Sequence, residues 1–367
     1  MTDQPTADLQ PGLRTVRRDA RSVAASLTNP GCVRRQTLDA AGVNLDRLAD
    51  ILGIAIPPTS ISAVIHGNRF EQLVVDNDAS HVRRLLADTF TVNVDDADLS
   101  DLSGEATPDG QLSRAVRARA TRRELVDYLN GGPPRLVRHA MTRLMVAGEW
   151  VYLEPDLLAF TADRQIVVCE VKSFPAIDGV ADPRKVAHAA LQMAVYVLSL
   201  RNTVGRLGGD PNLICGHGLL ILPSNFTTWP AGFPVALEPA VIRLRRQIGQ
   251  MRTLSADIGR LLPPHPDTGQ PNPDAVQQAL RQLPCRFSDA CTGCPLHHSC
   301  RDEAWQQRTV DVLGGPVQET CGAVTQLDRV LALADGTARP HGPSEAALAD
   351  ILGRASAVAG RYGLGGR

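Results

Sequence analysis

Three residues near the middle of the chain have side chains suited to breaking a phosphodiester bond: Asp156, Glu170 and Lys172. Two carboxylates close together in an apolar setting repel one another and favour a divalent cation between them. Such a cation polarises a phosphoryl oxygen and lowers the pKa of a bound water, while an ammonium group orients that water or stabilises developing charge. The residue types therefore predict a hydrolytic site that uses Mg²⁺ or Mn²⁺, provided that the fold brings the three side chains together.

Two predicted strands, residues 151–160 and 166–172, must position these side chains. A polar turn joins the strands, and a hairpin symmetric about that turn places Asp156 directly opposite Glu170. Directly opposed side chains in an antiparallel pair lie about 5 Å apart. Because side chains alternate along a strand, Lys172 shares a face with Glu170. The alternative interpretation is a strand pair that ends in an ordinary salt bridge.

The use of lysine at position 172 is itself informative. Among the 38 Lys and Arg residues of the chain, only Lys172 and Lys185 are lysine. A compact ammonium differs in its chemistry from a planar guanidinium. A lysine at this strand position therefore favours the catalytic interpretation over the salt bridge.

Two predicted helices carry further polar candidates. On the helix at residues 60–75, His66 and Glu71 lie within about one and a half turns of each other. Glu71 is thus a candidate third acid, and an exposed helix glutamate is the alternative. On the helix that follows the second strand, Gln192 and Tyr196 are four residues apart and share one stripe. That stripe is either functional or the solvated face of the helix.

Taken together, these motifs resemble the PD-(D/E)XK nuclease superfamily, and within it the RecB-type nucleases and the CRISPR-associated iron-sulfur exonucleases. Pro155-Asp156 followed by Glu170-Val171-Lys172 matches the pattern that names the superfamily. Gly67-Asn-Arg-Phe-Glu71 resembles the first helix of RecB-type nucleases, and Gln192-Met-Ala-Val-Tyr196 resembles their Gln-x-x-x-Tyr motif.

The resemblance implies a role for each of these residues. The groups that would hold the metal are Asp156, Glu170, the backbone carbonyl of Val171, and Glu71 or His66. Lys172 would assist the attacking water. The residues that would position the substrate are Gln192 and Tyr196.

The cysteines form a second pattern. The chain has eight, and disulfides are not expected in a reducing cytosol. Three of them lie within ten residues, in the motif Cys291-x2-Cys294-x5-Cys300, which is compact enough for all three sulfurs to bind one metal centre. His297 or His298 as the fourth ligand would complete a zinc site, whereas Cys32 would give four thiolates for an iron-sulfur cluster.

The resemblance favours the cluster, because RecB-type iron-sulfur nucleases carry one cysteine before the nuclease core and three after it. It implies a [4Fe-4S] cluster on Cys32, Cys291, Cys294 and Cys300, with Zn²⁺ as the alternative. Such a cluster would close a loop of more than two hundred residues and have a structural role. Cys285 lies close enough in the sequence to replace one of these ligands.

The expected fold class is α/β, with a restriction-endonuclease-like core in which helices flank a mixed central sheet, together with helical additions and an iron-sulfur module. Three segments are expected. They are a polar tail at residues 1–20, a PD-(D/E)XK nuclease domain at 21–305 with cysteines at both ends, and a helical C-terminal extension at 306–367.

Composition narrows the expected partners. The formal net charge is -1, so contact with nucleic acid must come from local patches such as the arginine-rich stretch 111–146, unless those arginines only solubilise a helix. The chain has no long apolar span and no hydrophobic leader, which predicts a cytoplasmic protein with no membrane partner. It has no G-x4-G-K-[ST] motif, so work along duplex DNA would need a helicase partner.

The expected function is that of a metal-dependent deoxyribonuclease, acting as an exonuclease on single strands or ends of DNA. The resemblance places such an activity in DNA repair, recombination or CRISPR-associated processing. Two other classes stay open: an iron-sulfur or zinc module that binds nucleic acid without cutting it, and a zinc-stabilised scaffold.

Overall fold

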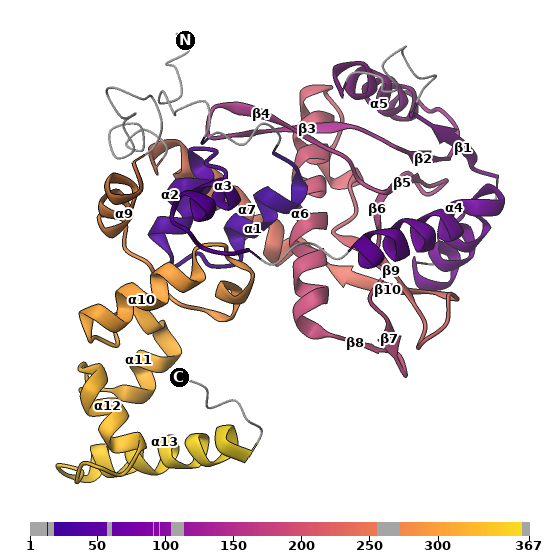
Figure 1. Cartoon of the computed structure of the whole chain (residues 1–367). Helices are drawn as coiled ribbons and strands as arrows, with labels where there is room; N and C mark the ends of the chain where they lie inside the picture. Colours follow the sequence, from indigo (N-terminus) through magenta and orange to yellow (C-terminus); the bar gives the residue numbers. More distant parts are fainter. Residues whose placement is uncertain are drawn as a thin grey trace.

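The largest sheet among the described residues is a mixed sheet of six strands, which lies in the right-hand part of Figure 1. This computed structural model describes residue 13 and residues 18–56, 61–90, 92–94, 96–103, 114–254 and 272–361. The β1–β2 and β6–β9 pairs are parallel, and the other neighbouring pairs are antiparallel. In spatial order the strands are β1 (Asp98–Asp101), β2 (Arg135–Arg138), β5 (Leu157–Phe160), β6 (Ile166–Val171), β9 (His217–Pro223) and β10 (Pro230–Ala236). The predicted α/β class, with helices around a mixed sheet, is confirmed.

Helices cover both faces of this sheet. All six residues of β6 are buried, as expected for a central strand that is covered on both sides. Val168 packs with helix α6 (Pro183–Arg206), whereas Cys169 packs on the opposite face with helix α4 (Ile61–Phe90). Glu170 is two residues beyond Val168, so its side chain points toward the α6 face.

Helix α4 is interrupted near its middle, where the predicted helix 60–75 ends. Residues 77–79 all have left-handed backbone angles, with φ between 52° and 55°. Two of these three residues are Asn and Asp, which tolerate that conformation better than most non-glycine residues. The first part of α4 carries Glu71 and is anchored on the sheet by the buried side chains of Phe70 and Val74.

The expected strand 151–160 is wrong, because it consists of two strands in different sheets. Strand β4 (Glu149–Leu153) pairs with β3 (Thr142–Val146) in a separate hairpin, whereas β5 belongs to the central sheet. Pro155 explains the break, since proline has no N–H with which to continue a ladder of hydrogen bonds.

Helix α6 connects β6 to the parallel strand β9 and begins as the sequence predicts. Asp182 caps it by accepting hydrogen bonds from the backbone N–H groups of Arg184 and Lys185 at 2.9 and 3.3 Å, and Pro183 occupies the first turn. Helix α7 (Glu238–Leu254) packs against α6. The other elements of this part are α5 (Arg114–Leu129), β7 (Ala176–Ile177), β8 (Val180–Ala181) and the 3-10 turn η2 (Pro211–Leu213).

The N-terminal helices pack against the segment that carries the cysteine motif (Figure 1). A hydrophobic cluster joins Leu38 and Leu48 to Val276 and Leu280. Most of the expected tail 1–20 lies outside the described residues, but Leu13 is buried in this cluster. The elements are α1 (Ala20–Leu27), α2 (Val33–Ala40), α3 (Leu45–Ile51), α9 (Pro273–Arg281), the 3-10 turn η4 (Asp289–Gly293) and α10 (His297–Gln307).

The C-terminal helices form a hydrophobic cluster of their own and extend away from the sheet (Figure 1). Gly322, with φ of 56°, ends the first of two short helices there. The elements are the 3-10 turn η5 (Asp311–Leu313), α11 (Gly315–Cys321), α12 (Leu327–Ala334) and α13 (Pro343–Arg361). Within the described ranges, no helix combines the length and apolar character needed to cross a bilayer.

Candidate active site

Asp156 and Glu170 meet at the end of the β5–β6 hairpin. Leu157 pairs with Cys169, so the register places the preceding residue, Asp156, opposite Glu170, as the symmetry of the hairpin predicts. The backbone N–H of Val171 donates a hydrogen bond of 2.7 Å to Oδ2 of Asp156. The strand backbone therefore fixes the position of the first acid.

Lys172 lies on the same side as the two acids. Its Nζ forms an ion pair with Oε1 of Glu170, and its backbone N–H donates to the carbonyl of Ile221 at 3.0 Å. The bond to Ile221 continues the contact with β9 one residue beyond β6. The side chain of Glu170 is fully buried, whereas that of Lys172 is 20% exposed, so the lysine reaches solvent and the carboxylate does not.

Ionisation of both Asp156 and Glu170 is electrostatically unfavourable. Burial, together with the charge of Asp156, raises the pKa of Glu170 to about 8, and Lys172 only partly offsets this. Burial also raises the pKa of Asp156, against the effect of Lys172. In addition, Oε2 of Glu170 is buried and has no hydrogen-bond partner among the described residues. A bound cation would satisfy that oxygen and remove the repulsion.

Glu71 borders a cavity of about 330 Å³ that Asp156 also lines. Burial raises the pKa of Glu71, and the nearby charge of Asp156 raises it further. Helix α4 therefore brings a third acid to the site from the opposite face of the sheet. His66 lies on the same helix but is exposed and does not line this cavity, so the structure does not bring it to the acids.

Gln192 and Tyr196 line the same cavity from helix α6. Both side chains are buried, and Nε2 of Gln192 donates a hydrogen bond of 2.9 Å to the hydroxyl of Tyr196. Burial, followed by the charges of Glu170 and Asp156, raises the pKa of Tyr196 well above its usual value. The tyrosine hydroxyl thus stays protonated beside the acids.

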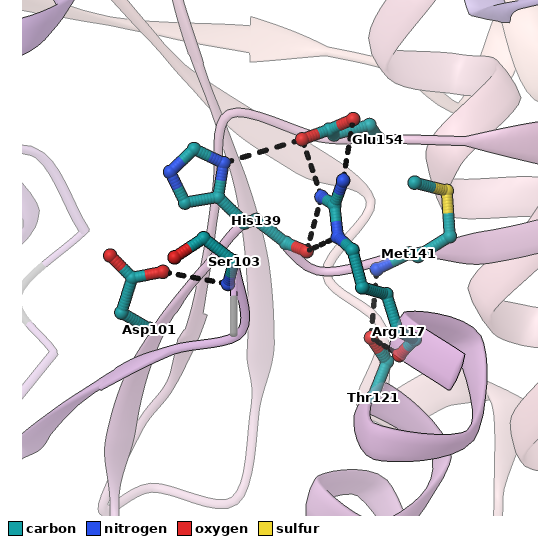
Figure 2. A network of polar contacts seen from close by, with 7 residues as sticks. All are labelled: Asp101, Ser103, Arg117, Thr121, His139, Met141 and Glu154. Carbon is teal, nitrogen blue, oxygen red and sulfur yellow. Dashed lines mark hydrogen bonds and ion pairs between the residues drawn. The ribbon is translucent and has the colours of Figure 1, made fainter. Parts of the chain in front are cut away.

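The motifs did not reveal a polar network that links Arg117, His139 and Glu154 (Figure 2). Two of its members, His139 and Glu154, line the cavity. Arg117 of α5 contacts the carbonyl of His139 at 2.6 Å and forms an ion pair with Glu154, which also accepts from Nδ1 of His139 at 3.3 Å. Burial would raise the pKa of Glu154, but hydrogen bonds from His139 and Arg117 lower it to about 2. His139 itself has a left-handed φ of 52°, which is uncommon for a residue with a side chain.

Two signals in the sequence could have drawn attention to this network. Glu154 directly precedes the Pro155-Asp156 motif, and His139 is the one histidine within the arginine-rich stretch 111–146. Nothing in the local spacing links the two residues, because a hairpin separates them. Arg21, on α1, also lines the cavity of Asp156, although no motif in the sequence singles it out.

The acid site suits a divalent cation held by few protein ligands. In the part of the chain that the structure describes, no group of three or more His, Cys, Asp or Glu side chains is arranged to hold a metal ion. Glu71 is therefore near Asp156 and Glu170 without converging on one point with them. Mg²⁺ commonly binds through one or two carboxylates and keeps several waters, so the pair Asp156 and Glu170 fits this cation.

Five cysteines line a second, small cavity between α2 and the segment from residue 285 to residue 300. They are Cys32, Cys285, Cys291, Cys294 and Cys300. Asn29 and Arg34 hold the two segments together, through hydrogen bonds to the carbonyls of Arg286 at 2.7 Å and Leu283 at 2.9 Å. The fold thus gathers the four cysteines predicted to act together, and adds Cys285.

Several N–H groups point at these sulfurs, as is usual around metal-bound thiolates. Arg34 Nη1 lies 3.2 Å from Sγ of Cys300, and the backbone N–H of Arg35 lies 3.4 Å from Sγ of Cys32. Nδ2 of Asn29 approaches Sγ of Cys291 at 3.6 Å. The donor chemistry fits a cluster or a zinc ion, although the described side chains do not converge on one metal position.

Of the two histidines considered as zinc ligands, only His297 lines the cysteine cavity. His298 borders a different cavity. Cys169 does not line the cysteine cavity; it is fully buried on the α4 face, and this burial raises the pKa of its thiol.

Comparison with known proteins assigns this chain to no family. The chain matches no protein-family model, and no curated protein matches it. Among solved structures, one match is a protein from Eubacterium rectale named "putative exonuclease", with 13% sequence identity, a TM-score of 0.28, and coverage of 63% of this chain and 83% of that one. At that TM-score the likeness carries no argument.

Proposed function

We propose that this chain is a phosphodiesterase of the PD-(D/E)XK superfamily with a restriction-endonuclease-like core. More specifically, we propose a metal-dependent deoxyribonuclease that acts as an exonuclease on single strands or ends of DNA. The observation that carries the proposal is the pair of acids, half-buried Asp156 and fully buried Glu170, opposed across a hairpin with Lys172 beside them. The resemblance of their motif to that of the superfamily supports it.

Each residue has a role in this proposal. Asp156, Glu170 and the carbonyl of Val171 hold Mg²⁺ or Mn²⁺, which when bound polarises the scissile phosphate and lowers the pKa of a water. Lys172 orients the attacking water and balances the charge that develops on the phosphate. The neutral hydroxyl of Tyr196, held by Gln192, hydrogen-bonds the substrate.

Glu71 has a supporting role. Its carboxylate borders the same cavity but does not converge with Asp156 and Glu170 on one point, so we assign it to accepting a hydrogen bond from water in that cavity. His66 is too exposed for a comparable role and is left out of the proposed site.

We further propose that Cys32, Cys291, Cys294 and Cys300 hold a [4Fe-4S] cluster with a structural role. The five-cysteine cavity and the N–H groups aimed at its sulfurs support the proposal. A zinc ion on three cysteines and His297 is the alternative. For duplex DNA, the chain would act with a helicase partner.

The test combines two measurements on one anaerobic preparation. Iron, sulfide and zinc analysis identifies the metal of the cysteine cavity, and degradation of end-labelled single-stranded DNA is followed with Mg²⁺, with Mn²⁺ and with neither. The proposal expects iron and sulfide in the protein and cleavage only with a divalent cation. Binding of DNA without cleavage in either metal would identify a non-cutting module instead.

A further inference from the structure

Another cavity, of about 630 Å³, adjoins the acid site and is larger than the cavity of Asp156. Arg21 and Gln192 line both cavities, and Lys172 lines the larger one. Helices α1 and α6, which pack together, contribute much of its wall. Any group that occupies this cavity therefore lies directly beside a phosphate held at Asp156 and Glu170.

The walls of the larger cavity carry positive charge that suits phosphate. Arg21 projects from α1, and Lys185 and His188 project from neighbouring positions on the first turns of α6. All three side chains are exposed to solvent. Two acids also line the cavity, Asp39 and Asp46; Asp39 is neutralised by an ion pair of 2.6 Å with Arg35.

An aromatic ring lies among these charges. Phe174 follows Lys172 by two residues, is half-buried, and lines the same cavity. The Nζ atom of Lys185 lies 5.6 Å from the centre of its ring. An aromatic face beside cations is the combination that proteins use to bind an unpaired strand, because bases stack on the ring while phosphates contact the cations.

We infer that this cavity binds the one or two nucleotides of an unpaired strand that adjoin the scissile phosphate. Arg21 and Lys185 contact their phosphates, and a base stacks on Phe174. The cavity volume lies within the roughly 300–1,000 Å³ typical of sites for small organic ligands, which admits nucleotides and excludes a duplex. The inference rests on the proposed function and specifies why the site prefers single strands.

The test is binding of a fluorescent single-stranded oligonucleotide, measured by anisotropy without divalent cations so that no cleavage occurs. Lys185→Ala removes a phosphate contact and should reduce the slope of log K against log salt by about 0.7. Phe174→Leu removes the stacking ring and should weaken binding about fivefold or more. Arg184→Ala is the matched control, because this neighbouring cation is exposed and does not line the cavity.

Cleavage of the same oligonucleotide with Mg²⁺ separates this inference from the proposed function. The inference expects Lys185→Ala to raise KM more than it lowers kcat. If the wild type binds and cleaves but both variants bind like Arg184→Ala, the nucleotide site is wrong and the nuclease stands. If both variants lose affinity but no preparation cleaves, the nucleotide site stands and the nuclease is wrong. A wild type that does not bind overturns the nucleotide site, and one that neither binds nor cleaves overturns both.

Discussion

The acid site and the cysteine cavity bring their functional groups together in different ways. Asp156 and Glu170 are neighbours in one hairpin, and backbone hydrogen bonds set their separation. Cys32, in contrast, reaches its partners only because residues from both ends of the described core pack together, as when Asn29 binds the carbonyl of Arg286, 257 positions later. One site depends on local strand pairing and the other on long-range assembly.

The comparison predicts that the acid site governs cleavage and that the cysteine cavity governs the stability of the fold. The acid site destabilises the folded state, since a half-buried and a fully buried carboxyl group face each other and an oxygen of Glu170 has no partner among the described residues. The cysteine cavity joins distant segments, and none of the described residues that line it also lines the cavity of Asp156. Substitutions at the acid site should therefore reduce cleavage and leave the fold intact. Substitutions of the cysteines should destabilise the fold and leave the catalytic groups in place.

The largest expected effect on cleavage comes from Asp156→Asn. Loss of this carboxylate should reduce kcat/KM for DNA roughly a thousandfold or more, because the stabilisation supplied by the metal is worth several kcal/mol. The same change removes repulsion from Glu170, so the Tm without divalent cations should stay the same or rise. Initial rates and thermal unfolding of the two proteins check this; a fall in both quantities would contradict the separation.

Next in size is the effect of Cys32→Ser. Loss of this ligand should abolish most of the bound iron and sulfide and lower the Tm by many degrees, because the link between distant segments is lost. Cys321→Ser is the matched control, since that cysteine is buried in the separate C-terminal cluster. Elemental analysis and thermal unfolding under anaerobic conditions provide the measurement. Full iron content in Cys32→Ser would show that Cys285 acts in its place.

A smaller effect is expected from pH. Burial and Asp156 raise the pKa of Glu170 to about 8 in the folded protein, above the value of 4.5 for a free glutamate. Its contribution to stability is therefore fully present below about pH 4.5 and is lost as the pH rises through about 8. Without divalent cations, the Tm should fall by several degrees across this window.

Mg²⁺ should counter that fall, because a cation binds the ionised carboxylate and its affinity increases with pH over the same window. Glu170→Gln should flatten the pH dependence of Tm and remove the effect of Mg²⁺. Thermal unfolding of both proteins from pH 5 to pH 9, with and without Mg²⁺, tests this; identical curves for the two would contradict the assigned pKa.

The smallest expected effect belongs to Arg117→Ala. Arg117 holds the carbonyl of His139 and the carboxylate of Glu154 without lining the acid cavity itself, so its loss should lower kcat/KM roughly tenfold, as for other groups that orient a site. Arg135→Ala is a suitable control, because Arg135 pairs with Glu124 and Asp127 away from the cavity. Equal rates in the two variants would remove this network from the site.

Much of the acid site could be predicted from sequence because it depends on short-range rules. The alternation of β6 and the symmetry of its turn give the positions of Asp156, Glu170 and Lys172. Spacing along a helix likewise gives the pair Gln192 and Tyr196. The break at Pro155 could also have been predicted, since proline interrupts a ladder whatever its tertiary context.

The remaining parts depend on tertiary packing that no local pattern encodes. Arg21 belongs to the site because α1 packs on α6, and His139 because a left-handed residue turns the chain after β2. His66 shows the converse, since its helix reaches the site but its own side chain faces solvent. The position of Cys285 in the cysteine cavity is likewise a product of the packing of α2 on the later segment.

The measurement that tests the central claim most directly is cleavage of end-labelled single-stranded DNA by Lys172→Ala beside the wild type, with Mg²⁺ and with Mn²⁺. Iron content and Tm of both proteins are measured on the same samples. The account predicts metal-dependent cleavage by the wild type and none by Lys172→Ala, with iron content unchanged. Undiminished cleavage by the variant, or no cleavage by an iron-loaded wild type in either metal, would contradict it.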